Sequence, residues 1–361
     1  MRIGIVGMPN AGKSSLFNAL TRGGAEAANY PFTTVEPNVA IVPVPDERLD
    51  RVADVVGAAP MVYETIAFHD IAGLIRGAHR GEGLGNQFLA NIRETDAIVH
   101  VVRAHDDPQV VHPEGRVDPA ADLEAVETEL LYADLEQAER RLERVSRQAK
   151  SHERAAVAEE AWLHEVVEGL RAGRPVRLAS SPPGDAPGAR AALQPLTSKP
   201  VLIVANVGED HPDALPGAVS EHAARTGALA VAVSARLESE LAEMDAEEAA
   251  AMREELGIAE SGLERVVRAA FDLLRLISFF TANAGSEARA HAVPDGTTAW
   301  DAAGEVHTDM QRGFVRAEVV PWDALVEAGG YAGARDRGTL RLEGRDYPVR
   351  DGDVITIRFS A

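Results

Sequence analysis

A phosphate-binding loop is the sequence feature that most limits what this chain can fold into. Residues 2–6 (RIGIV) form a short apolar run, and Gly7-Met-Pro-Asn-Ala-Gly-Lys-Ser14 follows directly. The residues after the loop have the apolar spacing of a helix. A strand, G-x-x-x-x-G-K-S and a helix in this order are typical of P-loop proteins. The sequence therefore predicts an α/β nucleotide-binding domain built around this loop.

Each part of the loop has an expected role. Its glycines let backbone N–H groups point at phosphate, and the helix N-terminus adds a partial positive charge. Lys13 reaches the β- and γ-phosphates, and the Ser14 hydroxyl ligates Mg²⁺. Arginine strongly outnumbers lysine in this chain, whose three lysines are Lys13, Lys150 and Lys199. This bias favours a phosphate site at Lys13 that the larger, planar arginine cannot fill.

Two switch-like segments follow the loop. A second predicted strand ends in Asp70-Ile-Ala-Gly73, the D-x-x-G pattern of GTPases, in which Asp70 acts on Mg²⁺ through water and the Gly73 N–H meets the γ-phosphate. The turn-rich stretch 29–38 suits a first switch that supplies one threonine to the metal. Leu74 stands where Ras-type enzymes carry a water-orienting glutamine, so another group must position the water. The glycine-rich stretch 77–87 is either a mobile second switch or an ordinary surface loop.

A predicted base site follows two further apolar strands. Asn206-Val-Gly-Glu209 stands where guanine-specific proteins carry N-K-x-D. Val207 replaces the lysine and Glu209 replaces the aspartate, so selectivity for guanine is expected to weaken. Asn206, or backbone carbonyls near Val207, could instead accept a hydrogen bond from the N6 amino group of adenine. Ser234 and Ala235 form the S-A turn that is expected to back the base.

The stretch between Asp70 and Asn206 is too long for a simple doubly wound domain, so an insertion is expected. Apolar residues from 131 to 149 alternate spacings of four and three, and a second helical run covers about 153–171. Together they predict a protruding helical hairpin. Basic residues lie near one face of its first helix: Arg140, Arg144, Arg147, Lys150 and Arg154. They form either a solvated face or an electrostatic footprint for RNA.

Composition excludes several classes of protein. The chain has no cysteine, which excludes disulfides, thiolate metal sites and cysteine catalysis. It has no apolar run long enough for a membrane span, and its N-terminus lacks the features of a secretory signal, so the cytosol is the expected compartment. The net charge of −21 argues against a broad nucleic-acid-binding face, although a local basic patch is compatible with it.

Together these residues resemble the YchF / Obg-like ATPase family, within the Obg group of translation-factor-class P-loop proteins. The resemblance runs along nearly the whole chain. Beyond the motifs above, it includes residues 27–32 (AANYPF), 36–39 (EPNV), 44–50 (VPDERLD), 81–88 (GEGLGNQF) and 91–95 (NIRET). It implies an ATP-preferring member of a mostly GTP-binding group that acts in the cytoplasm and associates with the ribosome.

The resemblance also implies roles for individual residues. The nucleotide loop falls on Asn10, Ala11, Gly12, Lys13, Ser14 and Ser15. The base contacts fall on Asn206, Val207 and Glu209, and the Mg²⁺ ligands on Ser14 and Thr34. The proposed catalytic histidine of the family matches His112. A K⁺ ion held by Asn10 is an alternative source of positive charge for hydrolysis.

The C-terminal residues 278–361 resemble the TGS domain of the family, a small β-grasp module. TGS modules elsewhere occur in proteins that contact tRNA or ribosomes, which is an argument by analogy. The expected domains are therefore a nucleotide-binding domain at 1–120 and 197–277, the inserted helical hairpin at 121–196, and the TGS domain at 278–361.

The leading functional prediction is a monomeric, Mg²⁺-dependent P-loop ATPase with slow intrinsic turnover, a molecular switch in translation or stress. Its expected partners are ATP, more weakly GTP, and the ribosome, through its large subunit and RNA. One alternative is a GTP-specific Obg-type GTPase in ribosome assembly. Another is a binding module that uses nucleotide only as a structural ligand, which Leu74 makes possible.

Overall fold

The computed structural model of the chain describes residues 1–27, 38–71, 84–107, 110, 115–258 and 260–360. The chain divides into two compact units, each described here by itself. The first comprises Met1–Val42 and Ala67–Leu273, and the second comprises Pro43–Ile66 and Leu274–Ala361. In the described part of the chain, no helix is both long and apolar enough to cross a membrane.

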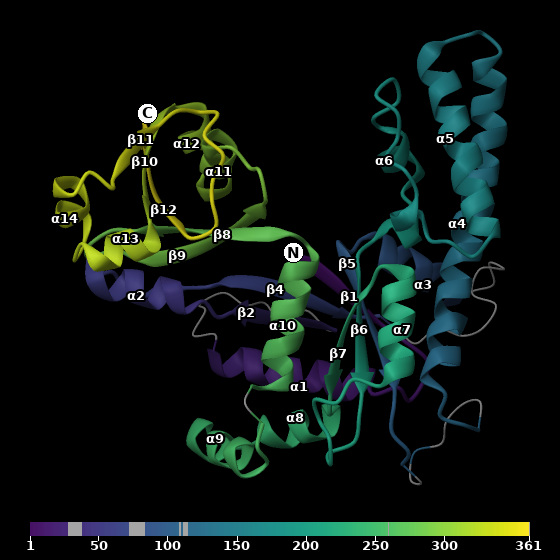
Figure 1. The fold of residues 1–361 in the computed structure, drawn as a ribbon, viewed down its shortest axis with the longest axis horizontal. Helices are drawn as coiled ribbons and strands as arrows, with labels where there is room; N and C mark the ends of the chain where they lie inside the picture. The colour runs from purple at the N-terminus through teal and green to yellow at the C-terminus, as the bar shows by residue number, and fades with distance from the viewer. Residues whose placement is uncertain (28–37, 72–83, 108–109, 111–114, 259, 361) are drawn as a thin grey trace. The chain divides into compact units, whose positions relative to one another are not determined.

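A six-stranded sheet forms the centre of the first unit (Figure 1). Its strands, in spatial order, are β2 (Val39–Val44), β4 (Glu64–Asp70), β1 (Arg2–Val6), β5 (Ala97–Arg103), β6 (Val201–Asn206) and β7 (Leu229–Val233). β1 pairs in parallel with β4 and β5, and the pairs β5–β6 and β6–β7 are also parallel. Parallel pairing brings the carboxyl ends of these strands to one edge of the sheet, where α/β proteins bind ligands.

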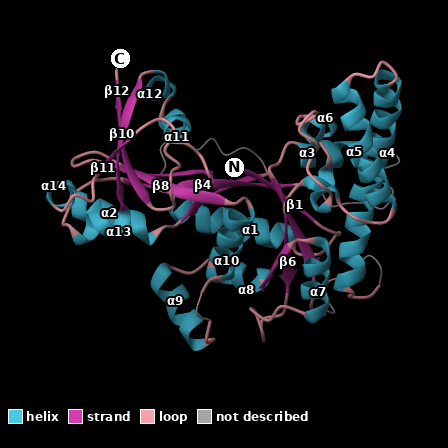
Figure 2. Cartoon of the chain, turned by 45° about the horizontal axis from the view of Figure 1, so that its top comes forward, coloured by secondary structure: helices cyan, strands magenta, loops and turns pink. Residues whose placement is uncertain are grey.

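Helices lie on both sides of these strands. They are α1 (Lys13–Ala27), α3 (Leu84–Arg93), α7 (Gly217–Thr226), α8 (Ala235–Leu241), α9 (Ala246–Glu255) and α10 (Gly262–Leu273). Figure 2 shows α1, α8 and α10 on one side of the strands and α3 and α7 on the other. Residues of α3 and α7 share one buried apolar core with β5 and β6, which fixes these helices against the sheet.

The predicted helical hairpin is present and belongs to the first unit. Its main helices are α4 (Pro119–Ala149) and α5 (Arg154–Arg171), followed by η2 (Val176–Leu178), α6 (Ala189–Leu193) and η3 (Leu196–Ser198). The Asp118 side chain accepts a hydrogen bond from the Ala121 N–H at 3.1 Å, which caps the start of α4. Trp162, Leu163 and Val166 of α5 are buried in a core shared with Ala138 and Val145 of α4.

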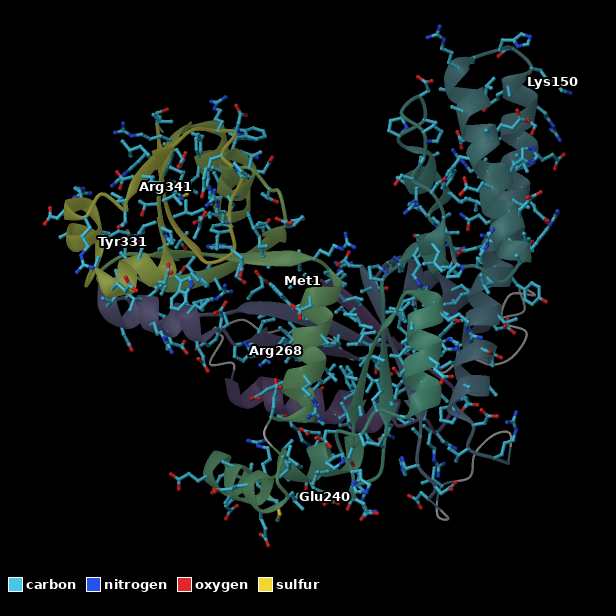
Figure 3. All side chains as sticks on the ribbon, in the orientation of Figure 1. Met1, Lys150, Glu240, Arg268, Tyr331 and Arg341 are labelled. Carbon is cyan, nitrogen blue, oxygen red and sulfur yellow. The ribbon has the colours of Figure 1, made fainter. Side chains whose placement is uncertain are left out.

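Two arginines of α4 form ion pairs with glutamates one turn earlier on the same helix. Arg140 lies 2.9 Å from Glu136, and Arg147 pairs with Glu143 in the same i, i+4 relation. Lys150 lies at the tip, where α4 ends (Figure 3). These two exposed ion pairs offset part of the positive charge of the five basic residues.

The second unit is built on another six-stranded sheet. Its strands, in spatial order, are β11 (Arg341–Glu343), β10 (Phe314–Pro321), β12 (Asp353–Phe359), β8 (Leu276–Ala282), β9 (Ala288–Pro294) and β3 (Met61–Val62). Its helices are α2 (Glu47–Val56), α11 (Ala299–Val306), α12 (Thr308–Arg312), α13 (Trp322–Glu327) and α14 (Tyr331–Asp336). β8 contributes to two separate cores, through Phe280 and Phe279, because neighbouring side chains of a strand point to opposite faces.

The segment Pro43–Ile66 belongs to this second unit, whereas the sequence placed it within the nucleotide-binding domain. Leu49, Val52 and Ala53 of α2 are buried against Phe280 and other residues of the C-terminal sheet. β3 extends that sheet by pairing in parallel with β9. The amphipathic pattern of α2 is visible in the sequence, but it does not tell which of two sheets the apolar face covers.

Candidate nucleotide-binding site

The loop between β1 and α1 has a backbone that requires glycine at two positions. Gly7 has φ +152° and Gly12 has φ +102°, both in the region that favours glycine. A Cβ at Gly7 would overlap the Val101 carbonyl oxygen of β5, and one at Gly12 would overlap the Asn206 side-chain amide. The loop is therefore pressed against β5 and β6 at the edge where the parallel strands end.

Lys13 is the first residue of α1 and is 8% exposed. Its Nζ donates a hydrogen bond to the Met8 carbonyl at 2.9 Å, so the ammonium reaches back across the loop. Burial lowers the pKa of Lys13, and the negative charge of Asp70 partly opposes that effect. A buried ammonium favours an anionic partner, and a triphosphate in this loop would supply one.

Asn206, the last residue of β6, links three segments of the site. Its Nδ2 donates to the Ala11 carbonyl of the loop at 3.0 Å, and its Oδ1 accepts from the Ala235 N–H at 3.1 Å. Ser234 caps α8, because its hydroxyl accepts from the Leu237 N–H. The phosphate loop, the end of β6 and the start of α8 are thus held together by one side chain.

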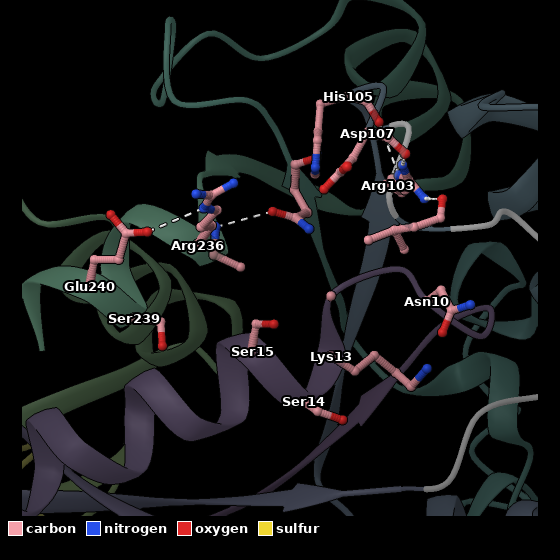
Figure 4. Close-up of a pocket in the computed structure, with 14 residues that line it drawn as sticks. Asn10, Lys13, Ser14, Ser15, Arg103, His105, Asp107, Arg236, Ser239 and Glu240 are labelled. Carbon is pink, nitrogen blue, oxygen red and sulfur yellow. Dashed lines mark hydrogen bonds and ion pairs between the residues drawn. The ribbon is translucent and has the colours of Figure 1, made fainter. Parts of the chain in front are cut away.

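These segments enclose a pocket of about 500 Å³ (Figure 4). Seven of the residues predicted from the sequence line it: Asn10, Gly12, Lys13, Ser14, Ser15, Asn206 and Ala235. The phosphate loop and the predicted base site, far apart in the sequence, therefore meet in one cavity.

The remaining predicted residues divide into two groups. Among the described residues, Ala11, Val207 and Ser234 are buried beside the pocket rather than lining it, Asp70 ends β4, and Glu209 pairs with Arg236 at 3.0 Å. Three predicted residues lie outside the described part of the chain, as does Leu74: Thr34, Gly73 and His112.

Sequence reasoning missed several residues that line the pocket. They are Arg103, His105, Asp107, Val110, Arg236, Ser239 and Glu240. The signal for the first of them was present, because β5, which is apolar apart from His100, ends in an arginine at the edge where parallel strands carry ligand sites.

Arg103 shapes the backbone beside the pocket. The buried guanidinium donates to the carbonyls of His105 and Asp107, each at 3.0 Å, and of Val110 at 2.8 Å. His105 in turn is hydrogen-bonded through Nδ1 to the Asn206 carbonyl at 2.9 Å. The chain leaving β5 is therefore anchored to its own strand and to β6.

The residues present fit a magnesium ion held mainly by phosphate and water. Ser14 lines the pocket, and Asp70 is close enough to Lys13 to influence its pKa. Hydroxyl and carboxylate oxygens are the donors that Mg²⁺ prefers. In the part of the chain that the structure describes, no cluster of three or more acidic or histidine side chains could hold a metal by itself. Such a site would depend on the nucleotide.

Comparison with protein families agrees with this architecture. Residues 2–151 match the family described as "50S ribosome-binding GTPase", and residues 276–360 match the YchF-GTPase C-terminal family, described as "Protein of unknown function (DUF933)".

The chain is also similar to curated proteins over its whole length. It is 46% identical to the "Ribosome-binding ATPase YchF" of Bacillus subtilis, with 99% of this chain and 98% of that protein covered. It is 46% identical to the protein of the same name from Escherichia coli O157:H7, with 99% of each covered.

Two solved structures have a similar fold. The YchF GTPase of Schizosaccharomyces pombe superposes with a TM-score of 0.88 at 32% identity, covering 99% of this chain and 97% of that one. A GTP-binding protein from Pyrococcus horikoshii superposes with a TM-score of 0.61 at 21% identity, covering all of both chains, which supports the fold alone.

Proposed function

The chain belongs to the YchF family, and on that premise we propose that it is a Mg²⁺-dependent, ribosome-associated NTPase that binds and hydrolyses ATP in preference to GTP. The observation that carries this proposal is the single pocket shared by Lys13, Ser14, Asn206 and Ala235. The residues expected to bind phosphate and the residues expected to bind the base line the same pocket, which supports a nucleoside triphosphate as its ligand.

At the phosphate end, the buried Lys13 ammonium and the N-terminus of α1 bind the β- and γ-phosphates. Ser14 and Thr34 would ligate the Mg²⁺ ion, Asp70 would act on it through water, and the Gly73 N–H would meet the γ-phosphate. When bound, the metal neutralises charge that develops on the phosphate oxygens. The residues of this chain would hold the phosphates and the metal ion in place.

At the base end, two substitutions support the preference for ATP. Val207 takes the place of the lysine of guanine-specific proteins and lies in the apolar core, with 7% of its surface exposed. Glu209, in place of the aspartate, pairs with Arg236 at 3.0 Å. The longer Glu209 side chain does not line the pocket, so its carboxylate is not placed to accept from the two adjacent donors of guanine. Asn206, or carbonyls near Val207, would accept from adenine.

For hydrolysis, we propose that His112 orients the attacking water, because Leu74 cannot. The alternative is a K⁺ ion at Asn10, a pocket residue whose backbone lies in the left-handed region with φ +62°. Either group would act from outside the D-x-x-G segment, and because Leu74 cannot align the water, we expect intrinsic turnover to be slow.

The curated relatives are named for ribosome binding, which supports the ribosome as partner. We propose that the protein acts in the cytoplasm as a monomeric switch in translation or stress, and that it contacts the large subunit and its RNA. A GTP-specific switch is the second candidate, because the fission-yeast structure bears the name GTPase.

Nucleotide titration tests the proposal. In competition with a fluorescent analogue, ATP should displace the analogue at lower concentration than GTP. Lys13→Ala should weaken triphosphate binding at least tenfold, about 1.4 kcal/mol. Lys150→Ala, at the tip of the hairpin, is the matched lysine control and should bind like the wild type. Unchanged affinity of a folded Lys13→Ala variant would refute the site, and a tenfold preference for GTP would favour the second candidate.

A further inference from the structure

We propose that the nucleobase stacks on the guanidinium of Arg236, and that Glu209 and Glu240 hold this side chain in position. This inference rests on the proposed nucleotide function and adds a residue to it. Arg236 is the second residue of α8, directly after the Ser234-Ala235 turn, and its side chain lines the pocket.

Two carboxylates hold the Arg236 side chain. Its Nε lies 3.0 Å from Glu209 Oε1 and 3.2 Å from Glu240 Oε1. Glu240 lies one turn further along α8, whereas Glu209 follows β6, so the guanidinium is tethered from two elements. The side chain is nevertheless 73% exposed, which leaves a planar cation facing open space. Figure 4 shows it on the side of the pocket opposite Asn10.

A side chain other than Val207 must cover the face of the base, because Val207 does not reach the pocket. In N-K-x-D proteins the stem of the lysine covers the face of the base. In this chain Val207 is buried in the core shared by β5, β6 and α7 and does not line the pocket. Ser239 and Glu240, on the same side as Arg236, have no planar cationic surface. Arginine stacks on aromatic rings through its flat guanidinium, and its aliphatic stem adds apolar contact.

Two other planar side chains line the pocket in the described residues, Arg103 and His105, and the Arg103 guanidinium is already occupied by three backbone carbonyls. The His105 ring is tied to the Asn206 carbonyl, and Figure 4 shows it away from Glu240 and Ser239. It is therefore placed to meet another side of the base than Arg236 does. Stacking on Arg236 does not distinguish purines, because every base has a π-face.

The experiment measures the affinity of Arg236→Ala for ATP, GTP and inorganic tripolyphosphate, each with Mg²⁺, by competition against a fluorescent nucleotide. We expect ATP and GTP to bind roughly three- to tenfold more weakly, with their ratio retained. Tripolyphosphate, which has no base, should bind as tightly as to the wild type. Arg236→Lys should lose most of the nucleotide affinity that Arg236→Ala loses, because an ammonium has no planar face.

Two further variants make the test specific. Arg140→Ala removes a similarly exposed, glutamate-paired arginine from the hairpin and should leave all three affinities unchanged. Glu240→Gln should weaken ATP binding in the wild type but not in the Arg236→Ala background, because it acts through Arg236.

Three results would overturn the inference: unchanged ATP affinity of Arg236→Ala, an equal loss for tripolyphosphate, or a large change in the ratio of ATP to GTP affinity. Failure of the nucleotide function itself would look different. In that case the wild type would bind neither nucleotide, or Lys13→Ala would have no effect.

Discussion

At the scale of single residues, several polar side chains of the first unit form hydrogen bonds with backbone groups and so fix the chain around the site. Arg103 holds three carbonyls, Asn206 joins the phosphate loop to α8, and Lys199 donates to the carbonyls of Arg93 and Thr95 at the end of α3. These contacts explain why position 199 carries a lysine rather than an arginine, because a compact ammonium suits converging carbonyls at a helix C-terminus. Such contacts preorganise the site before nucleotide arrives.

The first prediction concerns His112. His112→Ala should lower single-turnover ATP hydrolysis at least tenfold without changing ATP affinity, because a group that orients water acts only in the transition state. Quenched-flow measurement with excess enzyme separates this step from binding and release.

His164→Ala, on the exposed side of α5, is the control and should retain the rate. Replacing K⁺ by Na⁺ tests the alternative, since it should slow hydrolysis only if an ion at Asn10 supplies charge. If neither change alters the rate, both groups are excluded, and a partner such as the ribosome must position the water.

At the scale of elements, a polar network fixes the root of the hairpin to the nucleotide-binding unit. Glu127 of α4 accepts from Arg177 of η2 and from Nε2 of His222 of α7, each at 3.0 Å. Arg177 also donates to the Thr226 carbonyl at 2.7 Å. Burial raises the pKa of Glu127, but His222 and Arg177 lower it by a larger amount together, so the carboxylate stays ionised at neutral pH.

The second prediction compares two glutamates one turn apart on α4. Glu127→Gln should lower the free energy of unfolding by about 2–3 kcal/mol, because it leaves the largely buried Arg177 charge without its partner. Glu124→Gln removes an exposed pair with Arg225 and should cost less than about 1 kcal/mol. Urea denaturation of both variants measures the difference. Equal losses would show that the network does not anchor the hairpin.

Part of the helix and strand pattern of this chain could be predicted from its sequence. Local signals located the phosphate loop and the hairpin helices, and short alternating runs in the C-terminal segment predict strands near 314–319 and 354–359; the structure contains all of these. The capping box Ser261-Gly-Leu-Glu264 and the apolar spacing after it predict a helix from 261 to about 276, whereas the helix in the structure ends at Leu273 and β8 begins at Leu276. Apolar spacing continues across that boundary, so periodicity alone does not locate it.

Long-range relations were harder to predict. Nothing local indicates that Pro43–Ile66 covers the C-terminal sheet, or that Glu209 meets an arginine that follows a different strand. Motifs identify residues whose chemistry needs a fixed spacing. Arg236 enters the pocket through tertiary packing instead, and sequence spacing does not predict packing of this kind.

At the scale of the whole molecule, each unit contains a buried histidine that resists protonation. Burial lowers the pKa of His100, in β5, to about 4, and that of His291, in β9, also to about 4. His291 stacks on Phe279 at 4.8 Å between ring centroids. In the described residues His100 Nε2 has no hydrogen-bond partner, and the negative charge of Glu127 opposes the effect of burial only in part.

The third prediction follows from these two pKa values. Unfolded histidine takes up a proton near its ordinary pKa of 6.5, whereas these folded side chains do so only near 4. As pH falls through this window, the unfolded state binds more protons and the free energy of unfolding decreases. Each histidine should lower the free energy of unfolding of its unit by about 2 kcal/mol between pH 7 and pH 5, and by about 3 kcal/mol once the pH reaches 4.

His100→Phe tests this expectation in the first unit. The substitution removes the titrating group and the unpartnered nitrogen, and a small cavity lined by His100, Val126 and Leu130 gives the larger ring room. Urea denaturation at pH 7 and pH 5 should show that this variant loses roughly 2 kcal/mol less stability than the wild type on acidification. His164→Gln, at an exposed position, should lose as much as the wild type. If His100→Phe is as acid-sensitive as the wild type, His100 is protonated near its ordinary pKa in the folded protein, and the acid sensitivity of this unit arises from other groups.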